Sequence, residues 1–378
     1  MALSSELPDV QPPADAGALR VAVVDDSAVV RGLVARWLME DGRFEVVGRF
    51  ANGRLAVDGI VTCRPDAVIL DIEMPVMDGL AALSELLKKV PGLKVLMAST
   101  LTRRNAEISL RALSLGAFDY IPKPESNSGI TTSASFREEL LRKLSGLLRQ
   151  PRSRTVSEAR PQAPHKARSH HAAAPITLRN FSSVKPRVIA IGSSTGGPQA
   201  LSRVFGEIGP HLASVPVVIT QHMPPTFTAI LAEHMGRIAG RPAREGRDGE
   251  PLLPGTIYIA PGGKHMDLRQ QDGHAVIRVY DGPEINFCRP AVDPLFESVA
   301  KLFGPSALSV VLTGMGHDGA AGALTIANAG GSVIAQDEAT SVVWGMPGAT
   351  AAAGACAAVL PLDRIGGRIL GLLGGVRS

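Results

Sequence analysis

Two groups of polar residues directly follow apolar, strand-like runs, where their side chains could do chemistry. The sequence GSSTGG follows the apolar run 188–191 and puts Ser194 on a glycine-flanked strand-to-helix turn. Such a turn exposes a nucleophilic hydroxyl above a sheet, in reach of a carbonyl carbon. The second group is acidic, because Asp25 and Asp26 end one apolar run and Asp71 ends another. That layout is typical of a switch that accepts a phosphoryl group, so the chain is predicted to combine an enzyme with a switch.

The acidic group belongs to a segment with a regular alternation. Five apolar runs, RVAVVDD, EVVGRF, AVILD, KVLMAST and FDYIPKP, alternate with helix-sized stretches, which predicts a doubly wound parallel α/β sheet. Ser99 and Lys123 lie at or just past the ends of the fourth and fifth runs. Aspartate and serine often end strands simply as turn residues. Because ligands collect at the carboxyl ends of parallel strands, however, the whole set is expected to converge on one cleft.

The chemistry of that cleft follows from its ligands. Closely placed carboxylates repel one another and favour a divalent cation, and hard oxygen ligands suit Mg²⁺, which can neutralise an incoming phosphoryl group. Asp71 would then be the nucleophile that forms an acyl phosphate. The motifs VVDDSAVVR, DIEMPVMDG, ASTLT and IPKP resemble those of response-regulator receiver domains over residues 19–125. By position, the resemblance implies Asp25 and Asp26 as the acidic metal-site pair, Asp71 as the phospho-acceptor, Ser99 as the switch hydroxyl, Tyr120 as the rotating aromatic ring, Lys123 as the phosphate contact, and the Glu73 backbone carbonyl as a metal ligand.

The second half of the chain shows the same alternation. RVIAIG, VPVVITQH, GTIYIAP, HAVIRVYD, ALSVVLTG and GSVIAQD read as strands, and Ser194, His222 and Asp318 lie at or after the ends of three of them. A serine hydroxyl needs a base to take its proton, and a buried carboxylate can orient a histidine for that task. The residues alone leave the partners open: His222, His265 and His317 compete as the base, and Asp318, Asp267, Asp293 and Asp337 compete as the acid. The order Ser, His, acid differs from the Ser, acid, His order of α/β-hydrolases.

Six further motifs narrow these alternatives by resemblance. IGSSTGGP, TQHMPPTFT, YIAPGGKHM, NFCRPAVDPLF, LTGMGHDGAAG and AQDEATSVVWGMP resemble the catalytic domain of chemotaxis protein-glutamate methylesterases, which also carry a receiver. The resemblance implies Ser194 as the nucleophile, His222 as the general base, Asp318 as the orienting acid, Thr195 and the Met315 backbone N–H near the oxyanion, and His265 at the rim of the site.

The same resemblance implies a substrate and partners. The expected reaction is hydrolysis of glutamate methyl esters, and deamidation of particular glutamines, on the cytoplasmic helices of a chemoreceptor, with release of methanol from the esters. Mg²⁺ would serve the receiver, the ester step would need no cofactor, and a chemotaxis histidine kinase would supply the phosphoryl group. Two other classes stay open from the sequence: a response regulator whose second domain only binds a partner, and a serine hydrolase or amidase with another substrate.

Length and composition set the domain plan. The 378 residues suggest two domains and a connector: an extension over 1–18, a receiver over 19–125, a flexible basic linker over 126–186 and a Rossmann-like esterase domain over 187–378. The formal net charge is +4, but residues 151–187 hold eight Lys and Arg against one acid, a net +7. The basicity therefore lies in a stretch rich in Pro, Ser, Ala and His that predicts disorder, and no nucleic-acid partner is expected.

Cysteines and apolar runs add two expectations. Cys63, Cys288 and Cys356 are widely spaced and form no metal-ligand motif, so they are expected to be small buried apolar side chains. The first residues lack the charge and apolar pattern of a secretory signal, and no run of about 18 apolar residues offers a membrane span. The protein is therefore expected to be cytoplasmic, without direct membrane insertion.

Overall fold

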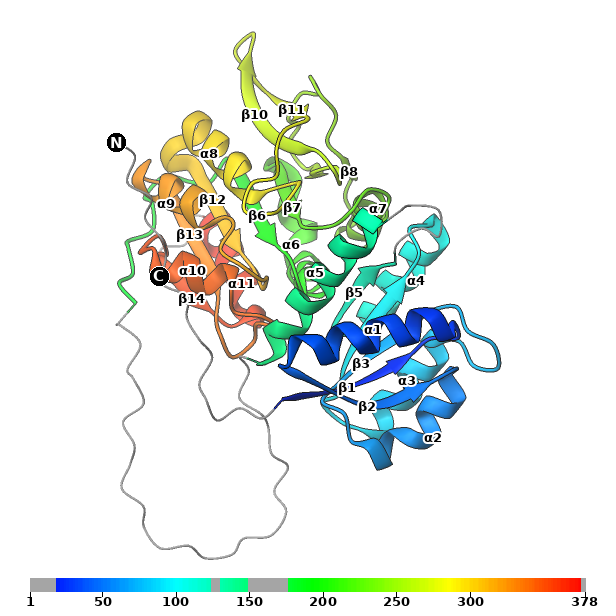
Figure 1. The fold of residues 1–378 in the computed structure, drawn as a ribbon. Helices are drawn as coiled ribbons and strands as arrows, with labels where there is room; N and C mark the ends of the chain where they lie inside the picture. Colours follow the sequence, from blue (N-terminus) through cyan, green and yellow to red (C-terminus); the bar gives the residue numbers. More distant parts are fainter. Residues whose placement is uncertain (1–17, 124–129, 149–175, 375–378) are drawn as a thin grey trace, which may run out of the picture. The chain divides into compact units, whose positions relative to one another are not determined.

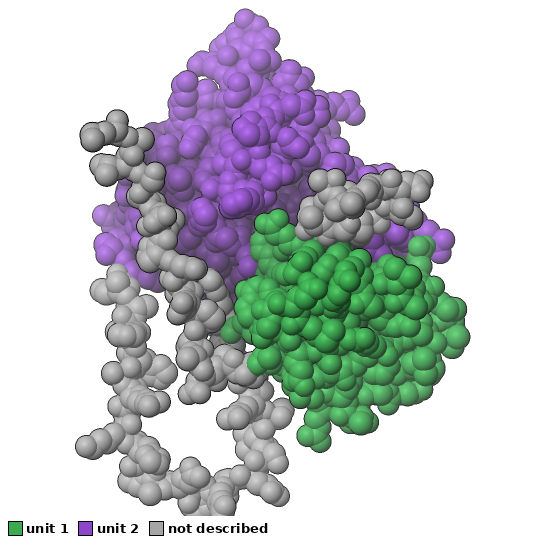
Figure 2. All heavy atoms as spheres, in the orientation of Figure 1, with its two compact units in different colours: residues 1–96, 128–156 green, residues 97–127, 157–378 purple. Residues whose placement is uncertain are grey.

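The structure is a computed structural model that describes residues 18–123, 130–148 and 176–374. The expected N-terminal extension over 1–18 and the middle of the expected linker lie outside the described residues, apart from residue 18. Contacts between Cα atoms divide the chain into two compact units, 1–96 with 128–156 and 97–127 with 157–378 (Figure 2). Within the described ranges, no helix is both long enough and apolar enough to cross a membrane.

The N-terminal sheet has five strands, as the alternation predicts (Figure 1). They are β1 (Leu19–Val24), β2 (Phe44–Phe50), β3 (Ala67–Asp71), β4 (Lys94–Ser99) and β5 (Asp119–Pro122), in the order β2-β1-β3-β4-β5. β1 pairs in parallel with both β2 and β3. The intervening helices are α1 (Ala28–Asp41), α2 (Gly53–Cys63), α3 (Gly79–Lys89) and α4 (Arg103–Ser114).

Side-chain caps fix where these four helices begin. In each case a polar side chain just before the helix accepts a hydrogen bond from the backbone N–H three residues later: Ser27 from Val30, Asn52 from Leu55, Asp78 from Ala81 and Thr102 from Asn105. A cap of this kind satisfies one of the unpaired N–H groups of the first turn. Three of the caps stand two or three residues past the strand ends, and Asp78 stands seven past β3, so the loops keep the strand-end side chains at one edge of the sheet.

A fifth helix corrects the expected boundary of the linker. The prediction of a flexible linker from residue 126 is wrong over α5 (Ile130–Leu148). Its apolar side chains at 136, 140, 144 and 147 are all buried, which is the spacing of one helical face. Phe136 lies 6.0 Å from Trp37 of α1, measured between ring centroids. The receiver therefore extends past residue 125, and the Ser, Thr and Gly at the start of this segment had masked the helical period that follows.

The second sheet has seven strands. They are β6 (Val188–Ser193), β7 (Val217–Gln221), β8 (Ala243–Glu245), β9 (Ile257–Ile259), β12 (Ala307–Val311), β13 (Ser332–Gln336) and β14 (Ala358–Leu360), in the order β14-β13-β12-β6-β7-β9-β8. Neighbouring strands pair in parallel. The helices are α6 (Gly197–Ile208), α7 (Phe227–Ala239), α8 (Val292–Phe303), α9 (Ala320–Asn328), α10 (Met346–Ala352) and α11 (Leu362–Gly374), and their apolar faces bury the sheet.

One expected strand lies outside this parallel sheet. HAVIRVYD forms β11 (His274–Tyr280), which pairs antiparallel with β10 (His265–Gln271) in a separate two-stranded sheet. Only Asp272 and Gly273 separate the two strands, and both have positive φ, 49° and 81°. A two-residue Asp-Gly connection makes a hairpin, whereas a parallel pair needs a crossover of a dozen or more residues. The expectation of one continuous βα series is therefore wrong at this point.

The end of the expected linker is also ordered against the second domain. The Arg179 backbone N–H donates to the Cys356 carbonyl at 2.8 Å, and its guanidinium donates to Asn328 Oδ1 at 2.9 Å. The Ser182 N–H donates to Ser332 Oγ at 2.9 Å. Residues 176–186 thus pack on the second domain rather than tethering it, which corrects the predicted boundary at 187.

Candidate active site

The predicted nucleophile, base and acid come from three adjacent strands. β6 lies between β12 and β7, and Ser194 directly follows β6. His222 directly follows β7, and Ser193 and Gln221, the residues before each, are paired partners in the sheet. Asp318 lies in the loop after β12. Strand order reverses between β6 and β12, and in open α/β sheets ligands bind at the carboxyl ends next to such a reversal.

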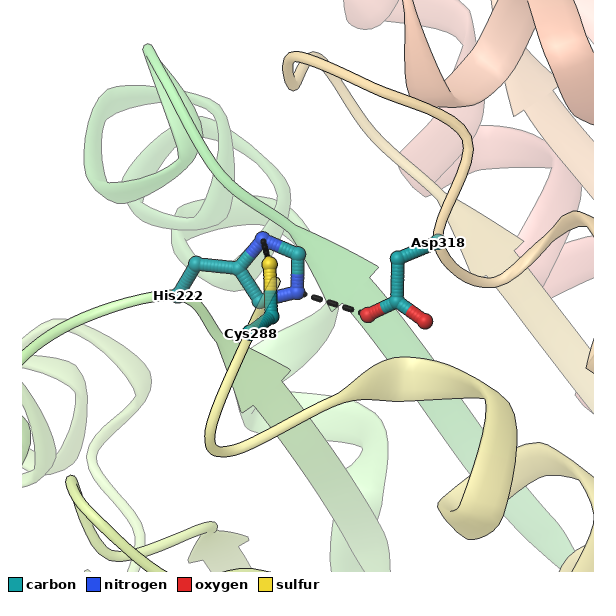
Figure 3. Close-up of side chains that lie close together, drawn as sticks. All are labelled: His222, Cys288 and Asp318. Atoms are coloured by element: carbon teal, nitrogen blue, oxygen red, sulfur yellow. Dashed lines mark hydrogen bonds and ion pairs between the residues drawn. The ribbon is translucent and has the colours of Figure 1, made fainter. Parts of the chain in front are cut away.

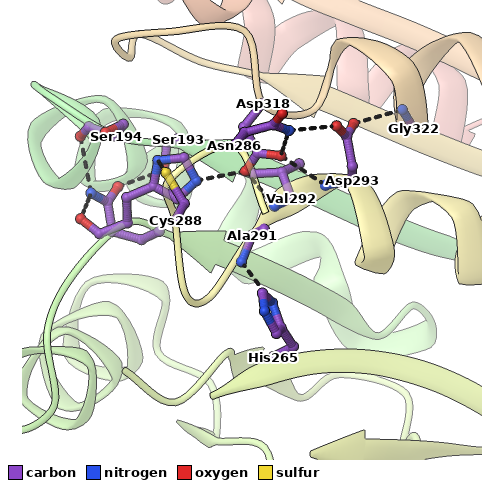
Figure 4. Close-up of polar contacts among 12 residues, drawn as sticks. Ser193, Ser194, His265, Asn286, Cys288, Ala291, Val292, Asp293, Asp318 and Gly322 are labelled. Atoms are coloured by element: carbon purple, nitrogen blue, oxygen red, sulfur yellow. Dashed lines mark hydrogen bonds and ion pairs between the residues drawn. The ribbon is translucent and has the colours of Figure 1, made fainter. Parts of the chain in front are cut away.

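Backbone contacts hold Ser194 tightly in its turn (Figure 4). Its N–H donates to the Thr313 carbonyl at 3.1 Å, and its own carbonyl accepts from Gln221 Nε2 at 2.9 Å. Gly314 lies so close that a Cβ built there would stand 2.9 Å from the Cβ of Ser194. Gly196 has φ 75°, a left-handed conformation that ends the turn before α6. The serine is 5% exposed, so it is fixed but reachable.

His222 and Asp318 form a direct pair. His222 Nε2 lies 2.7 Å from Asp318 Oδ2, and both side chains are largely buried. Because a carboxylate accepts, Nε2 donates to it in both charge states of the ring, and Nδ1 is the proton acceptor when the ring is neutral. The imidazolium beside it counteracts the effect of burial and holds the pKa of Asp318 below its usual value. Asp318 is therefore ionised and able to orient the ring and stabilise its cation.

Three further donors hold the Asp318 carboxylate. At the start of α8, the Val292 N–H donates to Oδ2 at 2.6 Å and the Asp293 N–H donates to Oδ1 at 3.2 Å. Asn286 Nδ2 donates to Oδ1 at 3.0 Å and to Asp293 Oδ2 at 2.9 Å. A buried carboxylate with this many donors has little freedom to turn away from His222.

The second side chain in contact with the His222 ring is a cysteine that the sequence did not point to (Figure 3). Cys288 Sγ lies 3.4 Å from His222 Nδ1, on the opposite side of the ring from Asp318. The expectation that all three cysteines are small buried side chains is therefore wrong for Cys288 and for Cys63, which are both partly exposed, although Cys356 is fully buried. Among the described residues, no hydrogen bond joins Ser194 Oγ to His222. Catalytic hydrogen bonds are often long in the absence of substrate.

These neighbours change the basicity of His222. Burial alone would lower the pKa of the ring, but the Cys288 sulfur and the Asp318 carboxylate favour the imidazolium and raise the pKa to about 9. A site that stabilises the imidazolium also stabilises the state that follows proton transfer from a serine. Cys288 and Asp318, which raise the pKa of His222, are thus the two side chains that contact its ring nitrogens.

Thr195, Met315 and His265 are the remaining candidate residues of the second domain. Thr195 is buried, its carbonyl accepts from Thr313 Oγ1 at 3.0 Å, and Met315 follows Gly314, the residue packed against Ser194. His265 is wholly buried, with Nε2 at 2.9 Å from the Pro283 carbonyl and Nδ1 accepting from the Ala291 N–H at 3.3 Å. Both ring nitrogens are thus used inside the domain, one of them beside the residues that bind Asp318, and the placement of His265 at the rim of the site stays a prediction.

The competing bases and acids make other contacts. His317 is exposed. Asp267 pairs with Arg278, Asp337 accepts from the Thr340 N–H at 3.0 Å, and Asp293 accepts from the Gly322 N–H at 2.7 Å. Burial and the nearby Asp318 charge raise the pKa of Asp293. Of the histidines and acids weighed from the sequence, the structure brings His222 and Asp318 into direct contact.

The acidic candidates of the first domain also converge. Asp25, Asp26 and Asp71 each have a carboxylate oxygen within 4.8 Å of the others, and Asp25 and Asp71 are buried. Closely packed carboxylates are the donor set that a hard divalent cation prefers, so these residues fit Mg²⁺. Glu73 follows Asp71 by two residues and its side chain is exposed.

The other receiver candidates lie at their own strand ends. Ser99 ends β4 and is 1% exposed, and the Lys123 N–H donates to the Ser99 carbonyl at 2.6 Å. Tyr120 lies in β5, and its ring stacks on that of Phe227 with centroids 4.4 Å apart.

Sequence reasoning missed Asn286, Cys288 and Gln221. The first two lie on a four-residue turn outside the three sheets, closed by hydrogen bonds between Ile285 and Cys288 in both directions. Asn286 and Phe287 have φ of 53° and 61° there, and Asn is one of the few residues that tolerate such values. An asparagine within an irregular segment was the one sequence feature that pointed to this turn, and it did not indicate that Asn286 would bind Asp318.

Comparisons with known proteins agree with this geometry. Residues 189–369 match the family described as CheB methylesterase, and residues 21–135 match the response regulator receiver domain. The chain is 52% identical over 373 residues to "Protein-glutamate methylesterase/protein-glutamine glutaminase of group 2 operon" of Rhodopseudomonas palustris strain CGA009, covering 95% of each chain. It is 54% identical over 371 residues to a protein-glutamate methylesterase/protein-glutamine glutaminase of Rhodopseudomonas palustris strain HaA2, again covering 95% of each. A relative in Bradyrhizobium diazoefficiens is 51% identical over 382 residues, covering 96% of each.

Proposed function

Because this chain belongs to the protein-glutamate methylesterase/protein-glutamine glutaminase family, we propose that it hydrolyses glutamate methyl esters on chemoreceptors and deamidates particular receptor glutamines. The observation that carries the proposal is the His222–Asp318 pair at 2.7 Å, at the sheet edge directly beside the Ser194 turn. Ester and amide hydrolysis by a serine need that combination.

In the proposed reaction, Ser194 attacks the ester carbonyl carbon while His222 Nδ1 takes the hydroxyl proton. The new bond gives a tetrahedral oxyanion near Thr195 and the Met315 N–H, and collapse expels methanol as the imidazolium returns the proton to the leaving oxygen. Water then repeats the sequence on the acyl-enzyme and releases the glutamate carboxylate. With a glutamine substrate the leaving group is ammonia. Asp318 keeps the imidazole oriented throughout and stabilises its cation.

For the first domain, we propose that Asp71 accepts a phosphoryl group from a histidine kinase. The convergence of the Asp25, Asp26 and Asp71 carboxylates supports this role. Asp25, Asp26, Asp71 and the Glu73 carbonyl would hold Mg²⁺, which when bound supplies positive charge to offset that of the phosphoryl oxygens. Lys123 would contact the phosphoryl group, and Ser99 and Tyr120 would respond to it.

For regulation, we propose that the unphosphorylated receiver restrains the esterase and that phosphorylation weakens the restraint. Contacts within the second compact unit support this. The Tyr120 ring stacks on Phe227, the first residue of α7, and Arg103 donates to both carboxylate oxygens of Glu233 at 2.8 and 2.9 Å. Gln199 Nε2 donates to the Ala117 carbonyl at 2.9 Å. A switch that moves Tyr120 would disturb the helix that begins five residues after His222.

The experiment that tests the proposed activity measures methanol release from methylated receptor membranes by the full chain and by Ser194→Ala. Loss of the hydroxyl should reduce the rate on the order of 10⁴-fold or more. Ser202→Ala is the matched control, because Ser202 lies on α6 and its hydroxyl only donates to the Pro198 carbonyl. Methanol release by Ser194→Ala at the wild-type rate would contradict the proposed role of Ser194 as the nucleophile. If the wild-type chain releases no methanol from a cognate receptor, the proposed activity is wrong.

A further inference from the structure

Three side chains of different metal-binding chemistry meet at the catalytic base. One ligand atom from each of His222, Cys288 and Asp318 lies within 4.8 Å of the other two (Figure 3). Imidazole, thiol and carboxylate together are the donor set of zinc sites in proteins. We propose that His222 and Cys288 form an inhibitory binding site for a thiophilic divalent cation such as Zn²⁺, with Asp318 orienting the histidine from the other side of the ring.

The distances favour His222 Nδ1 and Cys288 Sγ as the two direct ligands. Zinc bonds of about 2.0 Å to nitrogen and about 2.3 Å to sulfur, at a tetrahedral angle, separate the two donor atoms by about 3.5 Å. The observed distance between Nδ1 and Sγ is 3.4 Å, so an ion fits with little rearrangement.

Asp318 fits the role of an orienting partner rather than that of a direct ligand. Its Oδ2 is 2.7 Å from His222 Nε2, whereas two ligands of one tetrahedral zinc would stand about 3.3 Å apart. Metal-binding histidines commonly donate their second ring N–H to a carboxylate, which fixes the ring and strengthens the ligand. The same hydrogen bond therefore prepares His222 for proton transfer and for metal binding.

The ion would inhibit by occupying the nitrogen that acts as the base. Asp318 accepts from Nε2, so Nδ1 holds the lone pair that must take the serine proton. A metal ion on Nδ1 occupies that lone pair. The thiol proton of Cys288, and the Nδ1 proton wherever the ring is an imidazolium, are released to solvent as the two side chains bind. Substrate hydrolysis and metal binding are then mutually exclusive.

The turn that carries Cys288 keeps the thiol at this place. Both hydrogen bonds of the Ile285–Cys288 turn are formed, at 3.1 and 2.9 Å, and Asn286 attaches the turn to Asp318 and Asp293. Cys288 is neither fully buried nor paired in a disulfide, and the neighbouring Phe287 is 88% exposed. An ion in solvent can therefore reach the sulfur.

The first test is spectroscopic and needs no substrate. The full chain is titrated with Cd²⁺, a zinc substitute, in excess Mg²⁺, and the ultraviolet sulfur-to-metal charge-transfer band is recorded. The carboxylate site at Asp25, Asp26 and Asp71 cannot produce this band. Wild type and Cys63→Ser, the matched thiol control, should develop it, and Cys288→Ser should not. A missing band in wild type, or an undiminished band in Cys288→Ser, overturns the proposal.

The second test measures methanol release under Zn²⁺ titration, with each variant compared with its own metal-free rate. Cys288→Ser should need more Zn²⁺ for half-inhibition, by at least the about tenfold that loss of an outer-shell partner costs a metal site. Equal sensitivity of wild type and Cys288→Ser would contradict the site.

If Cys288→Ser does not fold, alkylation of the wild-type chain decides instead. Zn²⁺ should protect Cys288 but not Cys63 from iodoacetamide, read by peptide mass spectrometry, and unprotected Cys288 would overturn the site. The band and the protection are independent of esterase activity, so failure of the metal site is distinguishable from failure of the proposed function.

Discussion

The two domains use the same kind of sheet edge for different chemistry. In the receiver, three carboxylates converge at the carboxyl ends of β1 and β3, which suits a hard cation and a phosphoryl group. In the esterase domain, a serine, a histidine and a carboxylate follow β6, β7 and β12, which suits acyl transfer. The comparison teaches that a parallel sheet only brings strand-end side chains close together. Which reaction can follow depends on the chemical type of those side chains.

The edges differ in how much they depend on segments outside the sheet. The three receiver acids lie on or directly after strands. Asp318, by contrast, is held by Asn286 and by the first residues of α8, and His222 is contacted by Cys288. The esterase edge should therefore be sensitive to changes in the turn 285–288, which lies outside the parallel sheet.

The change with the largest expected effect on the esterase rate replaces the acid of the esterase edge, Asp318. Asp318→Asn puts an amide where a carboxylate accepts from His222 Nε2, which favours the wrong tautomer of the ring. Methanol release should fall on the order of 10⁴-fold with the fold intact. Asp337→Asn is the control, since that residue only caps a turn near Thr340. A loss under about tenfold would mean that Asp318 does not orient the base.

A second change alters the position of the serine and leaves all charges in place. Gly314→Ala adds a methyl group that would meet the Met346 sulfur first and would stand 2.9 Å from Ser194 Cβ and 3.0 Å from its backbone nitrogen. Because a displacement of about 1 Å at a reacting group can cost about 10²-fold, the rate should fall by that order. Gly206→Ala on α6, where the nearest atom is 4.0 Å away, serves as the comparison. Wild-type activity in Gly314→Ala would show that the close approach is not needed.

A third change tests the turn outside the sheet. Asn286→Ala removes one donor to the Asp318 carboxylate. A hydrogen bond to a charged group contributes about 1.5–3 kcal/mol, which corresponds to about 10- to 100-fold in rate if it is felt fully in the transition state. The measurement is kcat against KM, and we expect the change in kcat. A change confined to KM would assign the turn to substrate binding instead.

The smallest expected effect concerns the restraint by the receiver. Arg103→Ala removes an exposed ion pair with Glu233, and such pairs contribute little. The rate without phosphodonor should rise a few-fold at most, and Arg104→Ala, on the same helix, should leave it unchanged. A fall in Arg103→Ala would mean that the contact supports the active enzyme rather than restraining it.

Sequence reasoning reached most of the fold because strand patterns and strand-end residues are local. The acids at 25, 26 and 71, the turn at Ser194 and the strands around them follow directly from alternating apolar runs. It failed where tertiary packing decides. The Ser and Thr residues in the first turns of α5 hid the helix, and residues 176–186 are ordered by contacts with Asn328, Ser332 and Cys356.

The site could be predicted only where its residues end strands. Cys288 comes to His222 through a turn 66 residues away in sequence, stabilised by an asparagine at positive φ. No local pattern encodes that contact. His265 was singled out by a motif, and nothing in the sequence indicated that both of its ring nitrogens accept or donate hydrogen bonds inside the domain.

In this account, one sheet edge carries the switch and the other carries the enzyme. The most direct test of that central claim measures methanol release with Mg²⁺, with and without a small phosphodonor, for wild type, Ser194→Ala and Asp71→Ala. The account predicts that the phosphodonor accelerates wild type, that Ser194→Ala is inactive in both conditions, and that Asp71→Ala keeps the basal rate and loses only the acceleration. Acceleration that persists in Asp71→Ala, or a basal rate that disappears with it, would contradict the assignment of the switch to one edge and the enzyme to the other.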